Sequence, residues 1–183
     1  MVEKLRAVEF YCGIGGMHFA WKELESVEVE VVAAYDINEV TNKIYRHLFP
    51  ETKLFQNNIQ IVSPALLDKL RADAWTMSPP CQPFTRKGNK LGAEDHRCDS
   101  LKVILSCLEG MDHPPRYVLV ENVQGFEGTS MHERLRNTLN AKGYEIQEYL
   151  LTPTDFGIPN SRPRYYLLAR LRPQGSSLGP APT

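Results

Sequence analysis

A cysteine that follows two prolines is the side chain in this sequence best placed to act as a nucleophile. Cys81 comes after a Pro-Pro pair, and the apolar run 74–77 before that pair is typical of a buried strand. Proline lacks an amide donor and fixes φ, so the chain must leave the sheet in a stiff turn. We therefore expect the thiol at the carboxyl end of a strand, where open α/β sheets bind ligands. A buried structural cysteine is the alternative, because free cysteines are often core residues.

A carboxyl group follows a second apolar run. Glu121 comes directly after Val118-Leu119-Val120 and begins the segment Glu121-Asn122-Val123. If the strand that ends at Glu121 lies beside the strand that precedes Cys81, the two side chains face one cleft. A carboxyl group at the end of an apolar strand is suited to proton donation near neutral pH. An ordinary loop or helix-capping acid is the alternative.

Two arginines alternate near the C-terminal end of the chain. Arg162 and Arg164 are separated by one proline. An extended backbone places alternate residues on the same face, so both guanidinium groups are expected to point the same way. They are suited to binding a carbonyl oxygen, a phosphate or the carboxylate of Glu121. A surface arginine pair at the start of a strand is the alternative.

Glycines lie where the first apolar run gives way to a helical pattern. The segment Gly13-Ile14-Gly15-Gly16 lets the backbone approach a ligand and directs amides at a carboxylate or phosphate. Asp36 ends the next apolar run, and a carboxylate at that place commonly binds ribose hydroxyls. The pattern is shorter than the dinucleotide fingerprint, which disfavours a nicotinamide dehydrogenase. A nucleoside-containing cofactor is predicted, with a tight structural turn and a solvated acid as the alternatives.

The elements that must position these residues alternate along the chain. Apolar and β-branched runs predict strands at 7–11, 29–35, 53–55, 74–77, 117–121, 145–151 and 164–171. Apolar residues at helical spacing predict helices at 17–24, 40–48, 64–70, 100–111 and 130–141. No helix fits the proline-rich stretch between the last two strands, so we expect those strands to pair antiparallel. The order of elements predicts a doubly wound α/β sheet.

Composition limits the classes of protein that this chain can belong to. Its 183 residues suffice for one domain, which we assign to 1–171, with a flexible tail at 172–183. The net charge of −1 argues against binding nucleic acid through bulk charge alone. The four cysteines form no Cys-x-x-Cys pair, so we expect no zinc site and reduced thiols in the cytoplasm or nucleus. No secretory or membrane-spanning segment is evident, and no membrane partner is expected.

Taken in order, these motifs resemble those of cytosine-5 methyltransferases. The resemblance covers about residues 5–171 and rests on Phe10-x-x-Gly13-x-Gly15-Gly16, Asp36, Pro79-Pro80-Cys81-Gln82, Glu121-Asn122-Val123 and Arg162-x-Arg164. The wider context looks most like the eukaryotic branch that methylates a cytosine in the anticodon loop of aspartate tRNA. The resemblance implies a Rossmann-like methyltransferase fold, with a mostly parallel sheet and an antiparallel last strand. It also implies nucleic acid as the partner, with tRNA favoured over DNA, and a monomer without metal.

The resemblance also implies S-adenosylmethionine as the cofactor and S-adenosylhomocysteine as its product. The methionine end of this cofactor would contact Ile14, Gly15 and Gly16. Its ribose would contact Asp36. Its adenine edge would contact Ile59 and Gln60. Many relatives carry an acidic residue just before the isoleucine, whereas this chain has Asn58.

By the same resemblance, the chemistry is divided among four side chains. Cys81 would attack C6 of the cytosine, and Glu121 would hold and protonate N3. Arg162 and Arg164 would position the base carbonyl and Glu121. A stacked base cannot reach such a site, so the cytosine must be flipped out or already unpaired.

Family members continue well beyond this length, with a target-recognition domain and a return segment that completes the cofactor site. We therefore expect an incomplete catalytic domain, truncated at the C-terminus. Two hypotheses remain open: an active methyltransferase acting on tRNA or DNA, and a non-catalytic module that holds cofactor or RNA without turnover.

Overall fold

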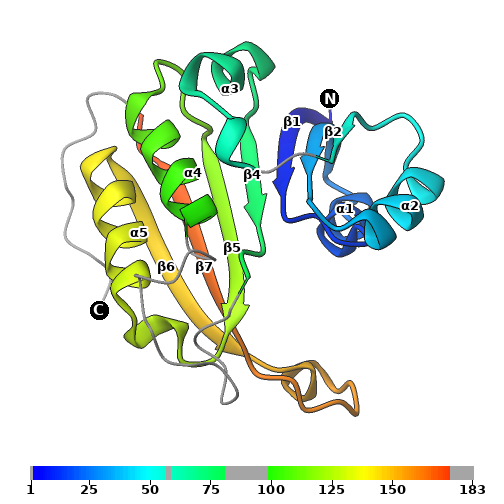
Figure 1. Cartoon of the computed structure of the whole chain (residues 1–183). Helices are drawn as coiled ribbons and strands as arrows, with labels where there is room; N and C mark the ends of the chain where they lie inside the picture. Colours follow the sequence, from blue (N-terminus) through cyan, green and yellow to red (C-terminus); the bar gives the residue numbers. More distant parts are fainter. Residues whose placement is uncertain (1, 57–58, 81–98, 174–183) are drawn as a thin grey trace.

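A single seven-stranded sheet organises the chain. The computed structural model describes residues 2–56, 59–80 and 99–173, and the strand order is β3-β2-β1-β4-β5-β7-β6 (Figure 1). The strands are β1 (Glu3–Phe10), β2 (Val27–Tyr35), β3 (Leu54–Phe55), β4 (Ala74–Met77), β5 (Tyr117–Val123), β6 (Tyr144–Leu151) and β7 (Arg164–Leu171). The first five strands are parallel, and β7 is antiparallel to both β5 and β6. The predicted doubly wound fold with an antiparallel last strand is confirmed.

Helices lie on both faces of the sheet. They are α1 (Gly16–Lys22), α2 (Glu39–Leu48), α3 (Pro64–Leu70), α4 (Asp99–Gly110) and α5 (Ser130–Ala141). Figure 1 shows α4 and α5 against the half of the sheet formed by β5, β7 and β6. The main core includes Ile104 of α4 and Leu135 of α5, and it extends across the sheet to Trp75 of β4 and to buried residues of β1 and β2. Trp21 of α1 packs in a separate cluster with residues of β1, β2 and β4.

The side-chain alternation of β5 decides which groups reach the site. Val118 and Val120 are buried, whereas Leu119 and Glu121 are only partly buried and point to the opposite face. The antiparallel register pairs Glu121 with Tyr166 and Val123 with Arg164. Arg164 is therefore a diagonal neighbour of Glu121 on the same face of the sheet.

The capping residues in the sequence correctly predict where α3 begins and where α5 ends. Ser63 caps α3 by accepting a hydrogen bond from the Leu66 amide at 3.3 Å, and Pro64 occupies the first turn, as predicted. The observed bounds of α5 match the predicted helix because the Thr129 hydroxyl caps its start and Gly143 follows its end with φ +85°. Side-chain capping and a left-handed glycine are local signals, so the sequence reveals them.

Several strand and helix boundaries differ from the sequence prediction, most of them by one or two residues. β1 begins at Glu3 because its charged first residues extend the pairing with β2, where Lys4 forms an ion pair with Glu28 at 2.9 Å. β5 continues to Val123, so Asn122 belongs to the strand. The stretch predicted to lack a helix contains one 3₁₀ turn, η5 (Pro153–Phe156), stabilised by a capping box.

Two classes of feature are absent from the part of the chain that the structure describes. No helix there is long and apolar enough to cross a membrane. No group of three His, Cys, Asp or Glu side chains within the same ranges is arranged to bind a metal ion. The assignment of a flexible tail to 172–183 stays a prediction, because only its first two residues are described.

Candidate functional site

An open cleft of about 730 Å³ lies at the carboxyl edge of the sheet. It is lined by residues from the end of β1, the start of α1, the ends of β4 and β5, and the connection between β6 and β7. Four residues singled out in the sequence line this cleft together: Gly16, Glu121, Arg162 and Arg164. Side chains separated by more than a hundred positions in the sequence therefore meet at the sheet edge where α/β proteins bind ligands.

An ion pair links two of the predicted catalytic side chains. Arg164 Nε lies 3.1 Å from Glu121 Oε1, and only 20% and 24% of the two side chains is exposed. Arg164 Nη1 also donates to the Pro163 carbonyl at 2.8 Å, which fixes the guanidinium plane further. Partial burial strengthens such a pair relative to one in open solvent. The pair holds the Glu121 carboxylate in one orientation toward the cleft.

Arg162 lines the same cleft but is held differently. Its backbone amide donates to the Thr152 hydroxyl at 3.0 Å, while its side chain is exposed. Within the described ranges this guanidinium group forms no ion pair. The two arginines therefore differ in their partners: Arg164 is paired with Glu121, whereas Arg162 has no acidic partner among the described residues.

The chain leaves β4 at the floor of the cleft. Ser78 lines the cleft, and its amide donates to the Phe10 carbonyl of β1 at 3.4 Å. The Pro79 carbonyl accepts a hydrogen bond from Asn122 Nδ2 at 3.4 Å. Pro79 is thereby tied to β5 beside Glu121. Cys81, the predicted nucleophile, lies outside the described residues, so its role stays a prediction.

The glycine turn between β1 and α1 is shaped by a positive φ and by close packing. Gly15 has φ +92°, a conformation that side-chain-bearing residues rarely adopt. A Cβ atom added there would lie 2.2 Å from Cε2 of Phe49. At Gly16, by contrast, a Cβ atom would meet nothing within 4 Å and would occupy open space in the cleft. The turn therefore places bare backbone at the cleft surface.

Asp36 connects this turn to α2. Its Oδ2 accepts a hydrogen bond from the Gly13 amide and its Oδ1 accepts one from the Asn38 amide, both at 2.8 Å. The Asn38 side chain in turn caps α2. The predicted role of Asp36 in binding ribose stays a prediction, and the structure adds a role in holding the two backbone turns.

The remaining predicted cofactor residues differ in exposure. Ile14 is exposed beside the glycine turn, whereas Ile59 is buried in the main core. Asp36 and Ile59 are not among the residues that line the cleft. The side chain of Gln60 and the whole of Asn58 lie outside the described residues, and the adenine contacts stay predictions.

A buried polar network beneath the cleft was missed by the sequence analysis. Glu9, the second-last residue of β1, is 1% exposed, and its Oε2 accepts a hydrogen bond from the Tyr45 hydroxyl at 2.8 Å. That hydroxyl lies 2.8 Å from His18 Nδ1, and the His18 ring stacks on Phe49 at 3.7 Å between centroids. Burial raises the pKa of Glu9 to about 7 and lowers the pKa of His18 to about 4. A charged residue inside the apolar run 7–10 was the available signal.

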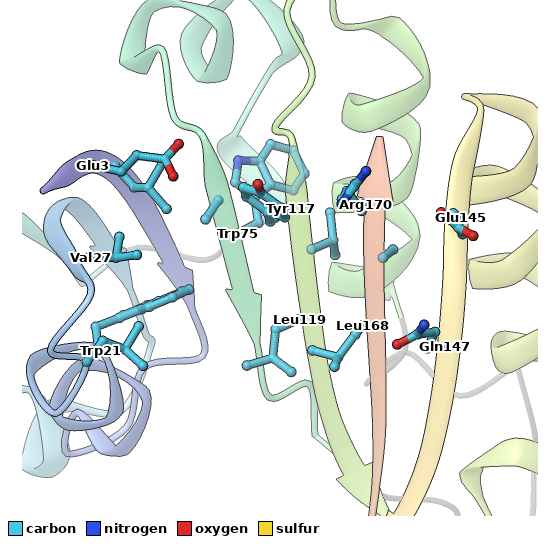
Figure 2. Close-up of a pocket in the computed structure, with 15 residues that line it drawn as sticks. Glu3, Trp21, Val27, Trp75, Tyr117, Leu119, Glu145, Gln147, Leu168 and Arg170 are labelled. Carbon is cyan, nitrogen blue, oxygen red and sulfur yellow. The ribbon is translucent and has the colours of Figure 1, made fainter. Parts of the chain in front are cut away.

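A second, apolar hollow adjoins the cleft, and Leu119 lines both. Its volume is about 520 Å³, and Figure 2 shows Trp21, Leu119 and Leu168 facing it from α1, β5 and β7. None of the predicted catalytic or cofactor residues lines it. The chemistry of this molecule is therefore assigned to the cleft at the carboxyl edge.

Together, the doubly wound sheet, the glycine turn and the acid–arginine pair define an α/β protein with a polar cleft at the carboxyl edge of its sheet. A model of the C-5 cytosine-specific DNA methylase family matches residues 5–181. The chain belongs to this family.

Individual relatives agree with the family match. The chain is 45% identical over 173 residues to a tRNA (cytosine(38)-C(5))-methyltransferase of Bos taurus, covering 94% of this chain and 44% of that protein. It is 41% identical over 172 residues to a DNA (cytosine-5)-methyltransferase of Dictyostelium discoideum, covering 92% of this chain and 45% of that protein. The crystal structure of the S. pombe Dnmt2 methyltransferase superposes with a TM-score of 0.82 at 39% identity, covering 96% of this chain and 52% of that one. The chain thus spans about half the length of these relatives.

Proposed function

We propose that this chain carries the catalytic part of a cytosine-5 methyltransferase that uses S-adenosylmethionine and acts on tRNA through a covalent Cys81–C6 intermediate. The observation that carries the proposal is the Glu121–Arg164 ion pair, 3.1 Å long, in the cleft that Gly16 also lines. Membership of the family supports the reaction type. We place the protein in the cytoplasm or nucleus as a monomer, and we expect no metal.

The residues around the glycine turn fit the proposed cofactor. Open space at Gly16 allows a ligand to touch the backbone. Glu9 lines the same cleft. Its Oε1 is buried without a hydrogen-bond partner among the described residues, so this oxygen is available to accept a hydrogen bond from a positively charged group of a ligand in the cleft. Ile14, Gly15 and Gly16 would hold the methionine end, and Asp36 the ribose. When bound, S-adenosylmethionine supplies the methyl group on a sulfonium centre.

The reaction requires three tasks from the side chains of this chain. Cys81, as a thiolate, attacks C6 of cytosine and makes C5 electron-rich. Glu121, in its protonated form, donates its proton to N3 as charge builds on the ring and takes the proton back when the ring is restored. Arg162 and Arg164 orient the base carbonyl and the Glu121 carboxylate. After methylation, loss of the C5 proton to a base and departure of the thiolate restore the aromatic ring.

Transfer RNA is the substrate that we favour. Several relatives are named as tRNA (cytosine(38)-C(5))-methyltransferases, and an unpaired loop avoids the cost of unstacking a base from a duplex. We propose the anticodon loop of aspartate tRNA. DNA is the alternative, because the Dictyostelium relative is named as a DNA methyltransferase.

A methyl-transfer assay with a cysteine variant tests the proposal. Tritiated S-adenosylmethionine is incubated with tRNA or duplex DNA and with the wild-type chain or Cys81→Ala. We expect incorporation into tRNA by the wild type alone, because Cys81→Ala removes the attacking sulfur. Calorimetry with S-adenosylhomocysteine should give similar affinity for both proteins, because the thiol does not hold the cofactor.

Two results would count against parts of the proposal. Turnover retained by Cys81→Ala would refute the nucleophile assignment, and incorporation into DNA alone would refute the substrate. Cofactor binding by the wild type without any turnover would favour the non-catalytic module.

A further inference from the structure

The turn that joins β6 to β7 exposes apolar side chains at the rim of the cleft. Phe156 is 68% exposed and Ile158 is 55% exposed, and both line the cleft together with Arg162. Figure 1 shows this turn extending beyond the edge of the sheet. In the described part of the chain, the Phe156 ring stacks on no other aromatic side chain. The fold therefore leaves a large aromatic ring exposed at the cleft.

This turn is held firmly by its own backbone and side chains. The Thr152 amide donates to Asp155 Oδ2 at 2.9 Å, and the Ile158 amide donates to the Pro153 carbonyl at 3.1 Å. Gly157 adopts φ +75°, which closes the 3₁₀ turn. The Arg162 amide is bonded back to Thr152. Phe156 is thus an exposed ring on a preorganised support, so ordering it on binding costs little entropy.

The charge beside the ring favours a nucleic acid strand. Arg164 is neutralised by Glu121, whereas Arg162 forms no ion pair with the described residues. An aromatic face with a free guanidinium group nearby is the combination that binds unpaired nucleotides, because the ring stacks on a base and the cation attracts a phosphate.

We propose that Phe156 is a stacking platform for an unpaired base adjacent to the target cytosine. The inference rests on the proposed function, because it takes the cleft to be the place where cytosine reacts. Phe156 is then a residue that positions the RNA strand, whereas Cys81 and Glu121 act on the cytosine itself. A protein segment that covers Phe156 is the competing occupant, and RNA binding distinguishes the two.

Fluorescence anisotropy with a labelled RNA hairpin tests the proposal. The hairpin has an unpaired loop that contains cytosine, and a fully paired duplex of the same length is the control ligand. We expect Phe156→Ala to weaken loop binding by between about 5-fold and 100-fold, the range for one stacked base. The loss should be equal at low and high salt, because stacking releases no counterions. Phe156→Trp should retain the wild-type affinity.

Leu168→Ala is the matched control. Leu168 is also an exposed apolar residue, on β7, but it faces the apolar hollow and not the cleft, so its replacement should leave RNA affinity unchanged. Equal affinity of wild type and Phe156→Ala overturns the stacking proposal while leaving methyl transfer to be judged by the Cys81→Ala assay. A wild-type chain that binds no loop RNA also overturns it. Loss of affinity in Leu168→Ala as well would contradict a specific role for Phe156.

Discussion

Glu9 is a carboxyl group kept inside an apolar strand, and its protonation must affect stability. Desolvation raises its pKa to about 7, against the opposing effect of the hydrogen bond from Tyr45. The negative charge of Asp36 also raises the pKa of Glu9. Burial, and after it the charge of Glu9, raises the pKa of the Cys12 thiol. Burial lowers the pKa of the nearby His18 to about 4. Protonated Glu9 is therefore the form that the folded chain prefers in weak acid.

The sign of the resulting pH dependence follows from linkage. The unfolded pKa of glutamate is 4.5 and the folded value of Glu9 is about 7, so between these values the folded chain binds the extra proton. The stabilisation is complete below pH 4.5 and is lost as the pH rises through 7. His18 has the opposite effect on stability between its folded pKa of about 4 and its unfolded pKa of 6.5. The two effects partly cancel, which flattens the dependence of wild-type stability on pH.

Glu9→Gln should therefore gain stability relative to wild type as the pH rises. We expect the difference in unfolding free energy to grow by about 1.4 kcal/mol per pH unit across the interval from 4.5 to about 7. Urea denaturation at several pH values measures it. Tyr45→Phe is the companion variant: losing its hydrogen bond raises the folded pKa of Glu9, which extends the upper end of the interval, while the lower end, set by the unfolded chain, stays at 4.5. Parallel profiles for Glu9→Gln and wild type would show that this carboxyl group does not titrate as described.

At the scale of elements, the connection between β1 and α1 is tightly constrained by its backbone conformation and its packing. This connection makes a sharp turn, exposes its backbone to the cleft, and packs against the ring of Phe49. Gly15 allows this packing because its missing side chain leaves room for that ring. The turn is stabilised by the hydrogen bond from the Gly13 amide to Asp36 and by the stacking of His18 on Phe49. The proposed cofactor site and the packing around Phe49 therefore depend on the same few atoms.

Gly15→Ala should destabilise the chain and weaken cofactor binding together. A side chain at φ +92° is strained, and its Cβ would overlap the Phe49 ring, so we expect a loss of about 2–4 kcal/mol in unfolding free energy. Gly128→Ala is the matched control, because its Cβ would meet nothing within 4 Å; its effect should stay within about 1 kcal/mol. Thermal denaturation and S-adenosylhomocysteine calorimetry measure both effects. A Gly15→Ala protein as stable as Gly128→Ala would contradict this packing argument.

The elements themselves were largely predictable, for local reasons. β4, β7 and α5 have the bounds expected from their apolar patterns and caps. The length of β1 was not predictable, because its charged first residues are held in the strand by partners on β2 that no local pattern reveals. The 3₁₀ turn η5 was missed because the prolines around it hid a capping box between Thr152 and Asp155.

At the scale of the whole molecule, strand order brings the site together. Because β4 and β5 are parallel neighbours and β7 pairs antiparallel with β5, Ser78, Glu121 and Arg164 meet at one edge. The Glu121–Arg164 contact was predictable once those strands were recognised. The network of Glu9, Tyr45 and His18 was not, because it joins β1, α2 and α1 through packing that the sequence pattern does not specify.

The central claim is that the sulfur of Cys81 and the Glu121–Arg164 pair act on one cytosine. Mass spectrometry of the chain incubated with S-adenosylmethionine and an RNA hairpin carrying 5-fluorocytosine tests it most directly, because fluorine at C5 blocks the final elimination. We predict a covalent complex whose RNA-linked peptide contains Cys81, reduced in Glu121→Gln and absent in Cys81→Ala. A complex linked through Cys12 or Cys107, or one that still forms in Cys81→Ala, would contradict the account.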